Sequence, residues 1–237
     1  MNTIIESLEK GSVEIEGQLV FGSNYIFLVK IEFRESNFFA VYKPQKGEIP
    51  LWDFPPKTLA NRETAAYVLS EALGWKLVPP TVIRSNAPLG KGSLQYFIAH
   101  DPQLNYFTFP PKIKDQLRPT AVFDILINNA DRKGSHILID EKESIKLIDH
   151  GICFHESQKL RTVVWDFIGE RIPISLMDDI NQLGDSLRNR SKIAVELEKL
   201  LSKQEIDALI DRIEKINESP FFPEPSTESR PFPFPLV

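Results

Sequence analysis

The amino-acid sequence predicts an α+β protein with two lobes. The predicted N-terminal lobe is small and has antiparallel strands with one principal helix, and the C-terminal lobe is larger and mainly helical. Before residue 100, segments rich in Val, Ile, Phe and Tyr alternate with short polar turns, the pattern of strands joined by hairpins. After residue 118, most apolar residues recur at helical spacing. The predicted division is residues 1–98, residues 99–218 and a tail of residues 219–237.

Composition fits two small lobes or one substantial core, because the chain has 237 residues, 42% of them hydrophobic and 26% charged. A net charge of −5 argues against a general nucleic-acid binder. The one cysteine, Cys153, excludes an intramolecular disulfide and fits a reducing compartment. The N-terminus is too polar for a signal peptide, and no window approaches the roughly 20 apolar residues of a membrane span. We therefore expect a cytoplasmic protein with no transmembrane segment.

The N-terminal lobe begins with a predicted short helix over residues 3–10, followed by three strands within residues 17–44. The third strand ends on Lys43, where the amine can reach into a cleft. Prolines exclude a helix from the next loop, and residues 59–74 then show a helical pattern with Glu63 in its second turn. A helix packed beside the sheet would present Glu63 to Lys43, and the pair would hold the lysine extended and charged.

The rest of the chain continues these patterns. The predicted elements are strands 78–85 and 93–100, helix 118–130, a short helix near residues 162–169, and helices 174–188 and 191–217, the last divided near Ser202. The tail has six prolines in its nineteen residues, which excludes a regular helix or a central strand. It is either disordered or packs its four phenylalanines in extended form along a surface.

The stretch 128–151 carries the densest polar motif. The sequence NADRKGSH precedes two short strand patterns, HILID and IKLID, which are separated by EKES. Asp131 lies before the first strand and Asp149 ends the second, so a hairpin would bring both carboxylates within reach of one ligand or metal. Carboxylates brought together in this way need a cation between them.

Simpler explanations account for each residue taken singly. Lys43 fits a solvated strand end and Glu63 an exposed helix residue, while Asp131 and Asp149 fit turn caps. The joint order of these four residues along two lobes favours a shared site.

Other polar residues downstream of Asp149 have mainly structural explanations. Cys153 lies between His150 and His155, yet the ligand spacing of a metal site is missing, so we expect core packing or local hydrogen bonds. Lys159 and Arg161 are candidates to receive an anionic substrate, although basic loop residues usually remain solvated.

This order of parts resembles the protein-kinase-like superfamily, and the local sequences are most similar to the phosphatidylinositol 3-/4-kinase-related group, particularly its short bacterial members. The resemblance covers roughly residues 14–170 and is strongest in ADRKGSHIL followed by LIDHG. In these relatives the catalytic loop reads Asp-Arg-His with an Asn five residues after the Asp, and the metal loop reads Asp-Phe-Gly. The matching positions here are Asp131, Arg132, Lys133, His136 and Asp149-His150-Gly151.

The resemblance implies a phosphotransferase that uses ATP and Mg²⁺ or Mn²⁺. Lys43 would contact the α- and β-phosphates, and Glu63 would orient Lys43. Asp149 would hold Mg²⁺ between the phosphates. Asp131 would accept or position the acceptor hydroxyl, and Arg132 would orient the loop or offset charge. These residue types suit phosphoryl transfer, which needs cations on the phosphate oxygens and one acid to aim the nucleophile.

Two departures from the relatives bear on activity. His136 replaces the expected Asn, and imidazole is a poor Mg²⁺ ligand, which implies one Mg²⁺ instead of two, a preference for Mn²⁺, or an inactive nucleotide binder. Asn129 is the alternative source of an oxygen ligand. The first turn is not Gly-rich, although Gly22 and Ser23 offer a backbone N–H and a hydroxyl to a phosphate.

The acceptor and the partners stay open at this point. A lipid, a small sugar-like alcohol and a protein hydroxyl all fit the expected transfer of the γ-phosphate. Two other functions are compatible with the same residues: an inactive nucleotide-binding module whose C-terminal helices or tail engage a partner protein, and a kinase-fold nucleotidyltransferase. Labelling of ATP at the α or the γ position separates them.

Overall fold

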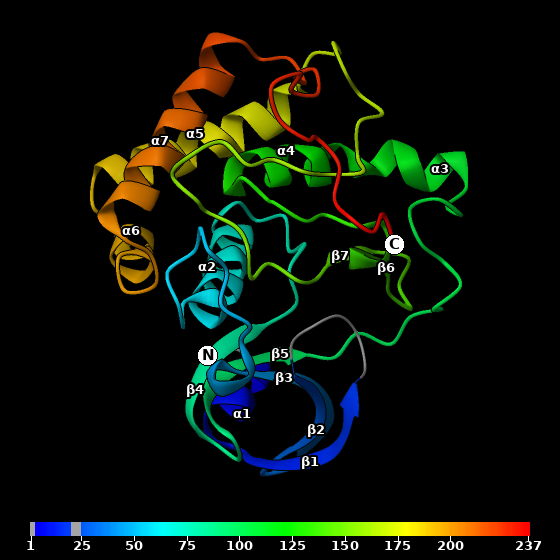
Figure 1. Cartoon of the computed structure of the whole chain (residues 1–237), viewed down its shortest axis with the longest axis vertical. Helices are drawn as coiled ribbons and strands as arrows, with labels where there is room; N and C mark the ends of the chain where they lie inside the picture. The colour runs from blue at the N-terminus through cyan, green and yellow to red at the C-terminus, as the bar shows by residue number, and fades with distance from the viewer. Residues whose placement is uncertain (1–2, 20–24) are drawn as a thin grey trace.

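The N-terminal lobe is an antiparallel sheet of five strands with the order β1-β2-β3-β5-β4. The computed structural model describes residues 3–19 and 25–237, and it places this sheet at one end of the molecule (Figure 1). Helix α1 packs on the sheet through Leu8, which lies in one buried cluster with Val29 and Ile31. The elements of this lobe are α1 (Thr3–Lys10), β1 (Ser12–Leu19), β2 (Ile26–Phe33), β3 (Ser36–Pro44), the 3₁₀ helix η1 (Gln45–Gly47), β4 (Thr81–Ala87) and β5 (Gly90–Tyr96).

The C-terminal lobe is mainly helical and carries one small hairpin, β6-β7, on the side that faces the sheet (Figure 1). No helix in the described part of the chain is long and apolar enough to cross a membrane. Helix α2 (Leu59–Ala72) lies between the two lobes. The elements of the C-terminal lobe are α3 (Pro111–Lys114), η2 (Asp115–Leu117), α4 (Arg118–Ile127), η3 (Gly134–His136), β6 (Ile137–Ile139), β7 (Ile145–Leu147), α5 (Ile174–Arg188), α6 (Lys192–Leu197) and α7 (Lys203–Glu218). The two-lobed α+β prediction is confirmed.

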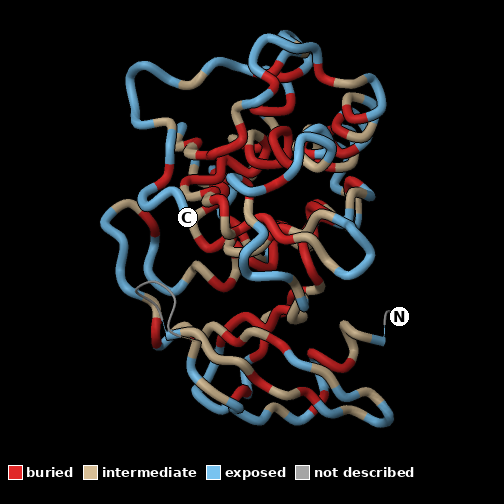
Figure 2. Tube along the Cα trace, turned by 90° about the vertical axis from the view of Figure 1, so that its right-hand side faces the viewer, coloured by how far each residue is buried: buried red, intermediate tan, exposed pale blue. Residues whose placement is uncertain are grey.

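Helix α2 belongs to the core of the helical lobe, although its sequence lies among the strands. The buried residues form two clusters, one on the sheet and one among the helices (Figure 2). Ala65 and Leu69 of α2 are in the helical cluster with Leu126 and Leu209. The helix also contacts β4 and β5, as expected of a helix beside the sheet. It therefore joins the two lobes instead of covering only the sheet.

A buried arginine fixes this position of α2. The Arg62 guanidinium donates to the Cys153 carbonyl and to the Glu205 carboxylate, and it lies 4.8 Å from the centre of the Phe54 ring. Glu205 also accepts from the Ser202 backbone N–H in the capping box that begins α7, at the residue where the sequence predicted a cap. Because Arg62 is next to Glu63 in the sequence, the Arg62–Glu205 ion pair fixes the position of Glu63 against the helical lobe.

The predicted strands 78–85 and 93–100 are observed at Thr81–Ala87 and Gly90–Tyr96, and two other predicted elements differ more from the structure. Strand β1 begins at Ser12, five residues before the expected start at Gly17, because Val13 and Ile15 already alternate with acids along an edge strand. Residues 162–169 form no helix. Their backbone instead forms hydrogen bonds with a distant segment of the chain. The Val163 N–H donates to the Arg132 carbonyl, and Thr162 forms a β-bridge with Arg132.

The tail packs in extended form along the helical lobe, which is one of the two expected arrangements. Phe221 forms a bridge with Arg171, and the Phe222 N–H donates to the Glu170 carbonyl. The Phe222 ring is 4% exposed and lies 5.4 Å from the Phe167 ring, within the main core. The other three tail phenylalanines are exposed.

Replacement of Phe222 by Ala is expected to lower the free energy of unfolding by about 3–5 kcal/mol, because it leaves a cavity in the main core. Phe221→Ala is the matched control, since its ring is 48% exposed and its truncation removes little buried surface. Urea unfolding of both variants measures the difference. Equal small losses in the two variants would show that the tail does not contribute to the core.

Candidate active site

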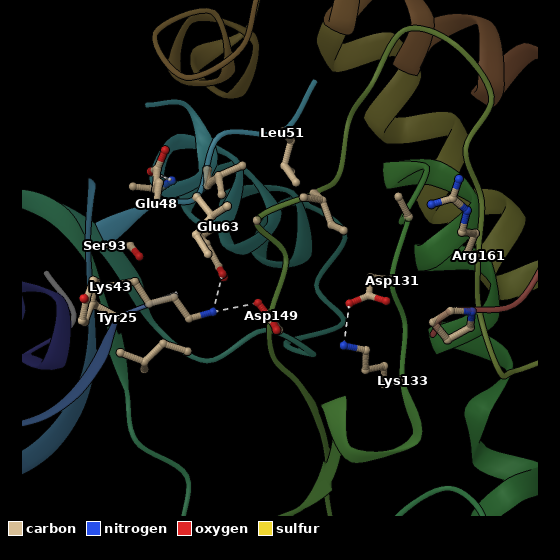
Figure 3. Close-up of a pocket in the computed structure, with 18 of the residues that line it drawn as sticks. Tyr25, Lys43, Glu48, Leu51, Glu63, Ser93, Asp131, Lys133, Asp149 and Arg161 are labelled. Carbon is tan, nitrogen blue, oxygen red and sulfur yellow. Dashed lines mark hydrogen bonds and ion pairs between the residues drawn. The ribbon is translucent and has the colours of Figure 1, made fainter. Parts of the chain in front are cut away.

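One cavity of about 390 Å³ lies between the two lobes, where β3, α2 and the loops around the β6-β7 hairpin meet (Figure 3). Charged side chains from distant parts of the chain line it: Lys43, Glu48, Glu63, Asp131, Lys133, Asp149, Arg161 and Arg230. Four of these are the acids and the lysine that the sequence predicted to share a site.

Lys43 reaches the cavity from the end of β3 and contacts two acids. Its Nζ lies 2.5 Å from Glu63 Oε1 and 3.0 Å from Asp149 Oδ1 (Figure 3). The neighbouring strand β5 allows this approach because Gly92 pairs with Pro44, and a Cβ on Gly92 would clash with the Lys43 carbonyl. The structure thus brings together the Lys43–Glu63 pair and adds Asp149 to it.

The three charges stabilise one another electrostatically. Burial alone would lower the pKa of Lys43, but the carboxylates of Asp149 and Glu63 outweigh burial and raise this pKa above its usual value. Burial alone would raise the pKa of Asp149, but the Lys43 ammonium outweighs burial and holds this pKa well below its usual range. At neutral pH the site therefore holds a charged lysine and an ionised aspartate.

Asp149 occupies a strained backbone position at the cavity. Its φ is 61°, in the left-handed region that residues other than glycine rarely adopt, and its side chain is 45% exposed. The second carboxylate oxygen lies 3.4 Å from His136 Nε2.

His136 faces Asp149 as a neutral ring. Burial lowers the pKa of His136 to about 4, so the imidazole is uncharged at pH 7. The Lys133 backbone N–H points at Nδ1, at 3.4 Å, which assigns the proton of the neutral ring to Nε2. In this tautomer the protonated Nε2 of His136 faces Asp149, whereas a metal ligand would need a free lone pair on Nε2.

Asn129 is buried in the loop that carries Asp131 and does not line the cavity. Its amide oxygen accepts from the Asp131 N–H at 3.0 Å, and its amide nitrogen donates to Asp124 at 3.0 Å. Both ends of the amide are therefore used to shape the loop. The structure does not bring Asn129 to Asp149, where an oxygen ligand would be required.

Arg132 is fully buried and ties the Asp131 loop to the Asp149 segment. Its guanidinium forms an ion pair with Asp124 at 3.0 Å and donates to the Ile148 carbonyl at 2.9 Å. It also lies 2.8 Å from His150 Nε2. Of the two roles that the resemblance implied, this geometry fits orientation of the loop, because the charge of Arg132 does not reach the cavity.

Asp124 was not predicted from the sequence as part of the site. It lies in α4, is fully buried, and accepts from three side chains: the Arg132 guanidinium, the Asn129 amide and the Thr162 hydroxyl. The available signal was an acid within the otherwise apolar run AVFDILI, where a lone carboxylate needs buried partners.

Asp131 lies in the cavity opposite the Lys43 cluster and pairs with Lys133 at 3.0 Å (Figure 3). Burial raises the pKa of Asp131, and Lys133 opposes this effect. Of the two downstream basic residues, Lys159 pairs with Asp53 at 2.7 Å, while Arg161 lines the cavity. Arg161 therefore remains available to an anionic substrate.

Glu48 was also missed from the sequence. Its Oε1 accepts from the Ala60 N–H at 3.4 Å, in the first turn of α2, where a carboxylate interacts favourably with the helix dipole. Gly22 and Ser23 lie outside the described residues.

The acids present fit a Mg²⁺ ion shared with nucleotide phosphates. Within residues 3–19 and 25–237 no group of three or more His, Cys, Asp or Glu side chains forms a self-sufficient metal site. Mg²⁺ in nucleotide sites is usually held by one or two carboxylates together with phosphate oxygens and water, and the partly exposed Asp149 suits that requirement. His150 and Cys153 are fully buried in the core, as their structural explanation predicted.

Sequence comparison places this arrangement among known proteins. A profile of the family described as phosphatidylinositol 3- and 4-kinase matches residues 55–203, more than half of the chain. Protein Rv2133c of Mycobacterium tuberculosis is 35% identical over an alignment of 266 residues, and the match covers 96% of this chain and 93% of the relative. Phosphatidylinositol 4-kinase gamma 4 of Arabidopsis thaliana is 35% identical over an alignment of 134 residues, and the match covers 45% of this chain and only 23% of the plant protein.

Solved structures share the fold at low sequence identity. The Golgi casein kinase with Mn/ADP bound has a TM-score of 0.59 at 14% identity, covering 92% of this chain and 74% of that one. The Helicobacter pylori proinflammatory kinase CtkA has a TM-score of 0.55 at 12% identity, covering 91% of this chain and 94% of that one. These likenesses establish a kinase-like fold. Because the family profile matches more than half of the chain, the chain belongs to the phosphatidylinositol 3- and 4-kinase family.

Proposed function

We propose that the chain is an ATP- and divalent-metal-dependent phosphotransferase that moves the γ-phosphate to a hydroxyl acceptor. The observation that carries the proposal is the chain of contacts Glu63–Lys43–Asp149, which faces Asp131 within one cavity. In this proposal residues 1–98 grip the nucleotide phosphates, and residues 99–218 hold the metal and aim the acceptor.

Lys43 and Glu63 bind the nucleotide in this proposal. The Lys43 ammonium already sits between two carboxylates, and Glu63 keeps it directed into the cavity when phosphate oxygens replace Asp149 as its second partner. Asp149 is the protein ligand of Mg²⁺. The bound ion would neutralise charge on the phosphate oxygens.

Asp131 aims the acceptor. Its carboxylate accepts the proton of the acceptor hydroxyl while the hydroxyl oxygen forms a bond to the γ-phosphorus. The bond from the γ-phosphorus to the β–γ bridging oxygen breaks, and ADP leaves with that electron pair. The Lys133 ammonium lies 3.0 Å from Asp131 and reduces the repulsion between the Asp131 carboxylate and the bound phosphates.

His136 supports Asp149 in this proposal instead of binding the metal. A neutral ring with its proton on Nε2 lies 3.4 Å from one oxygen of Asp149 and leaves the carboxylate negative. One protein carboxylate then suffices for the ion, so the replacement of the expected Asn by His136 is compatible with activity. In this proposal Asn129 shapes the loop of Asp131 and does not bind the metal.

The test is incubation of the full chain with ATP labelled at either the γ or the α position, in Mg²⁺ and in Mn²⁺, with a panel of lipid, sugar and protein hydroxyl acceptors. Transfer of the γ label alone supports the proposal. Transfer of the α label would identify a nucleotidyltransferase, and nucleotide binding without transfer of either label would identify an inactive binding module. Absence of nucleotide binding would contradict all three functions.

A further inference from the structure

The buried Arg62 joins three segments of the chain that are far apart in the sequence. Its guanidinium donates to the Cys153 carbonyl and to the Glu205 carboxylate, and its Nε–H donates to the Thr58 hydroxyl at 3.3 Å. The side chain is 1% exposed. All three nitrogen atoms of the guanidinium therefore have partners: at the start of α2, in the segment that follows Asp149, and in α7.

Both acids that contact Lys43 lie on segments that Arg62 joins. Glu63 is the next residue in α2, and the Cys153 carbonyl belongs to the segment that begins at Asp149. Lys43 Nζ lies 2.5 Å from Glu63 and 3.0 Å from Asp149, so a shift of α2 against this segment would break one of the two contacts. Arg62 therefore keeps the two acids at a separation that one ammonium group can span.

Glu205 is fixed on the helical lobe by contacts of its own. One oxygen of its carboxylate accepts from the Arg62 guanidinium, and the other accepts from the Ser202 N–H at 2.8 Å. Helix α7 is anchored in turn by Leu209 and Ile213, which are buried in the main core. The position of α2, and with it that of the phosphate-binding lysine, therefore depends on α7.

The ion pair between Arg62 and Glu205 is shielded from water. The Phe54 ring covers the guanidinium at 4.8 Å, and the His155 ring packs edge-on against Phe54 at 5.1 Å. Removal of one partner from a buried ion pair leaves an uncompensated charge, whereas removal of both partners does not. The two kinds of change therefore separate a loss of stability from a loss of position.

We propose that Arg62 is a positioning residue for the binding of nucleotide phosphates by Lys43, with Glu205 of α7 as its anchor. Arg62 does not line the cavity, so it contacts neither the nucleotide nor the metal. It acts through Glu63 and Asp149, whose separation decides whether Lys43 reaches the phosphates while Asp149 binds the metal. The inference rests on the proposed function and assigns to that site a residue and a helix outside the cavity.

Binding of ATP and of adenosine by two variants tests this role. Arg62→Met leaves the charge of Glu205 without its partner, whereas Arg62→Met combined with Glu205→Gln removes both charges and keeps an acceptor for the Ser202 N–H. We expect the double variant to regain most of the thermal stability that the single variant loses. We expect both variants to bind ATP with Mg²⁺ at least about tenfold more weakly than the wild-type chain. Adenosine lacks the phosphates that Lys43 contacts, so its affinity is expected to stay unchanged.

Calorimetry measures both affinities at a temperature where circular dichroism shows each variant to be folded. Arg84→Met is the matched control, because Arg84 is 7% exposed and donates to the Leu8 and Gly11 carbonyls, away from the cavity. This variant is expected to lose stability and to bind ATP normally.

Two results would overturn the inference while leaving the proposed function intact. One is ATP binding that returns to the wild-type value in the double variant, since Arg62 would then act on stability alone. The other is an equal loss of ATP and adenosine affinity, which would show a general disturbance of the cavity. If the wild-type chain does not bind ATP, the proposed function is wrong and the inference is wrong with it.

Discussion

Asp149→Asn is expected to abolish metal-dependent nucleotide binding, whereas Asp131→Asn is expected to retain it and to lose phosphoryl transfer by about 10²–10⁴-fold. The two carboxylates lie in the same cavity but have different partners. Asp149 contacts Lys43 and His136, and Asp131 contacts Lys133. Because an amide has nearly the size of a carboxylate, any change in binding or transfer results from the loss of the negative charge and of the ability to accept a proton.

Two assays separate these effects. Equilibrium binding of a fluorescent ATP analogue, with and without Mg²⁺, measures the nucleotide site, and transfer of the γ label measures chemistry. Asp185→Asn is the matched control, because this acid is 71% exposed on α5 in an i,i+3 pair with Arg188. If both active-site variants bind and transfer like the wild-type chain, the assignment of these two acids is wrong.

Asp124→Ala is expected to lower the free energy of unfolding by about 3–5 kcal/mol, because it leaves the buried charge of Arg132 without its partner. The same change removes the acceptor of the Asn129 amide and of the Thr162 hydroxyl. These groups hold the loop of Asp131 and the segment that follows Asp149. We therefore expect transfer activity to fall even at temperatures where the variant is folded.

Chemical unfolding followed by tryptophan fluorescence measures the loss of stability. Asp207→Ala provides the comparison, since this helical acid forms an exposed i,i+4 pair with Lys203 and its removal is expected to cost less than about 0.5 kcal/mol. A loss of similar size in the two variants would show that Asp124 is not the centre of a buried network.

The local parts of the fold could be predicted because their signals are local. Helix α2 begins after the prolines of the preceding loop and ends before Gly74, whose φ of 72° lies in the left-handed region that favours glycine. Ser202 and Glu205 have capping-box spacing, and the structure forms both of its hydrogen bonds. In contrast, the packing of α2 into the helical core depends on Arg62 and Glu205, which are 143 residues apart.

The charged residues of the candidate site could be predicted from the sequence, but the buried hydrogen bonds around them could not. Lys43, Glu63 and Asp149 follow from a strand end, a helix turn and a hairpin end, and the structure brings them into contact. Asn129 and Arg132 looked equally available, yet both are used by the buried Asp124.

The position of the tail could not be predicted either. Its prolines exclude a helix and a central strand, but they do not indicate which surface an extended segment packs against. Its contacts with Gly134 and Thr162 join residues about a hundred and about seventy positions apart in the sequence, which no local pattern encodes. The cavity wall that includes Arg230 therefore emerges only from the folded chain.

A crystal structure of the full chain with Mg²⁺ and a non-hydrolysable ATP analogue tests the central claim most directly. The account predicts that the metal contacts the Asp149 carboxylate, that Lys43 Nζ contacts the phosphates while keeping Glu63, and that Asp131 lies beside the γ-phosphate. Phosphates bound away from Lys43 and Asp149, or a metal held by other residues, would contradict it.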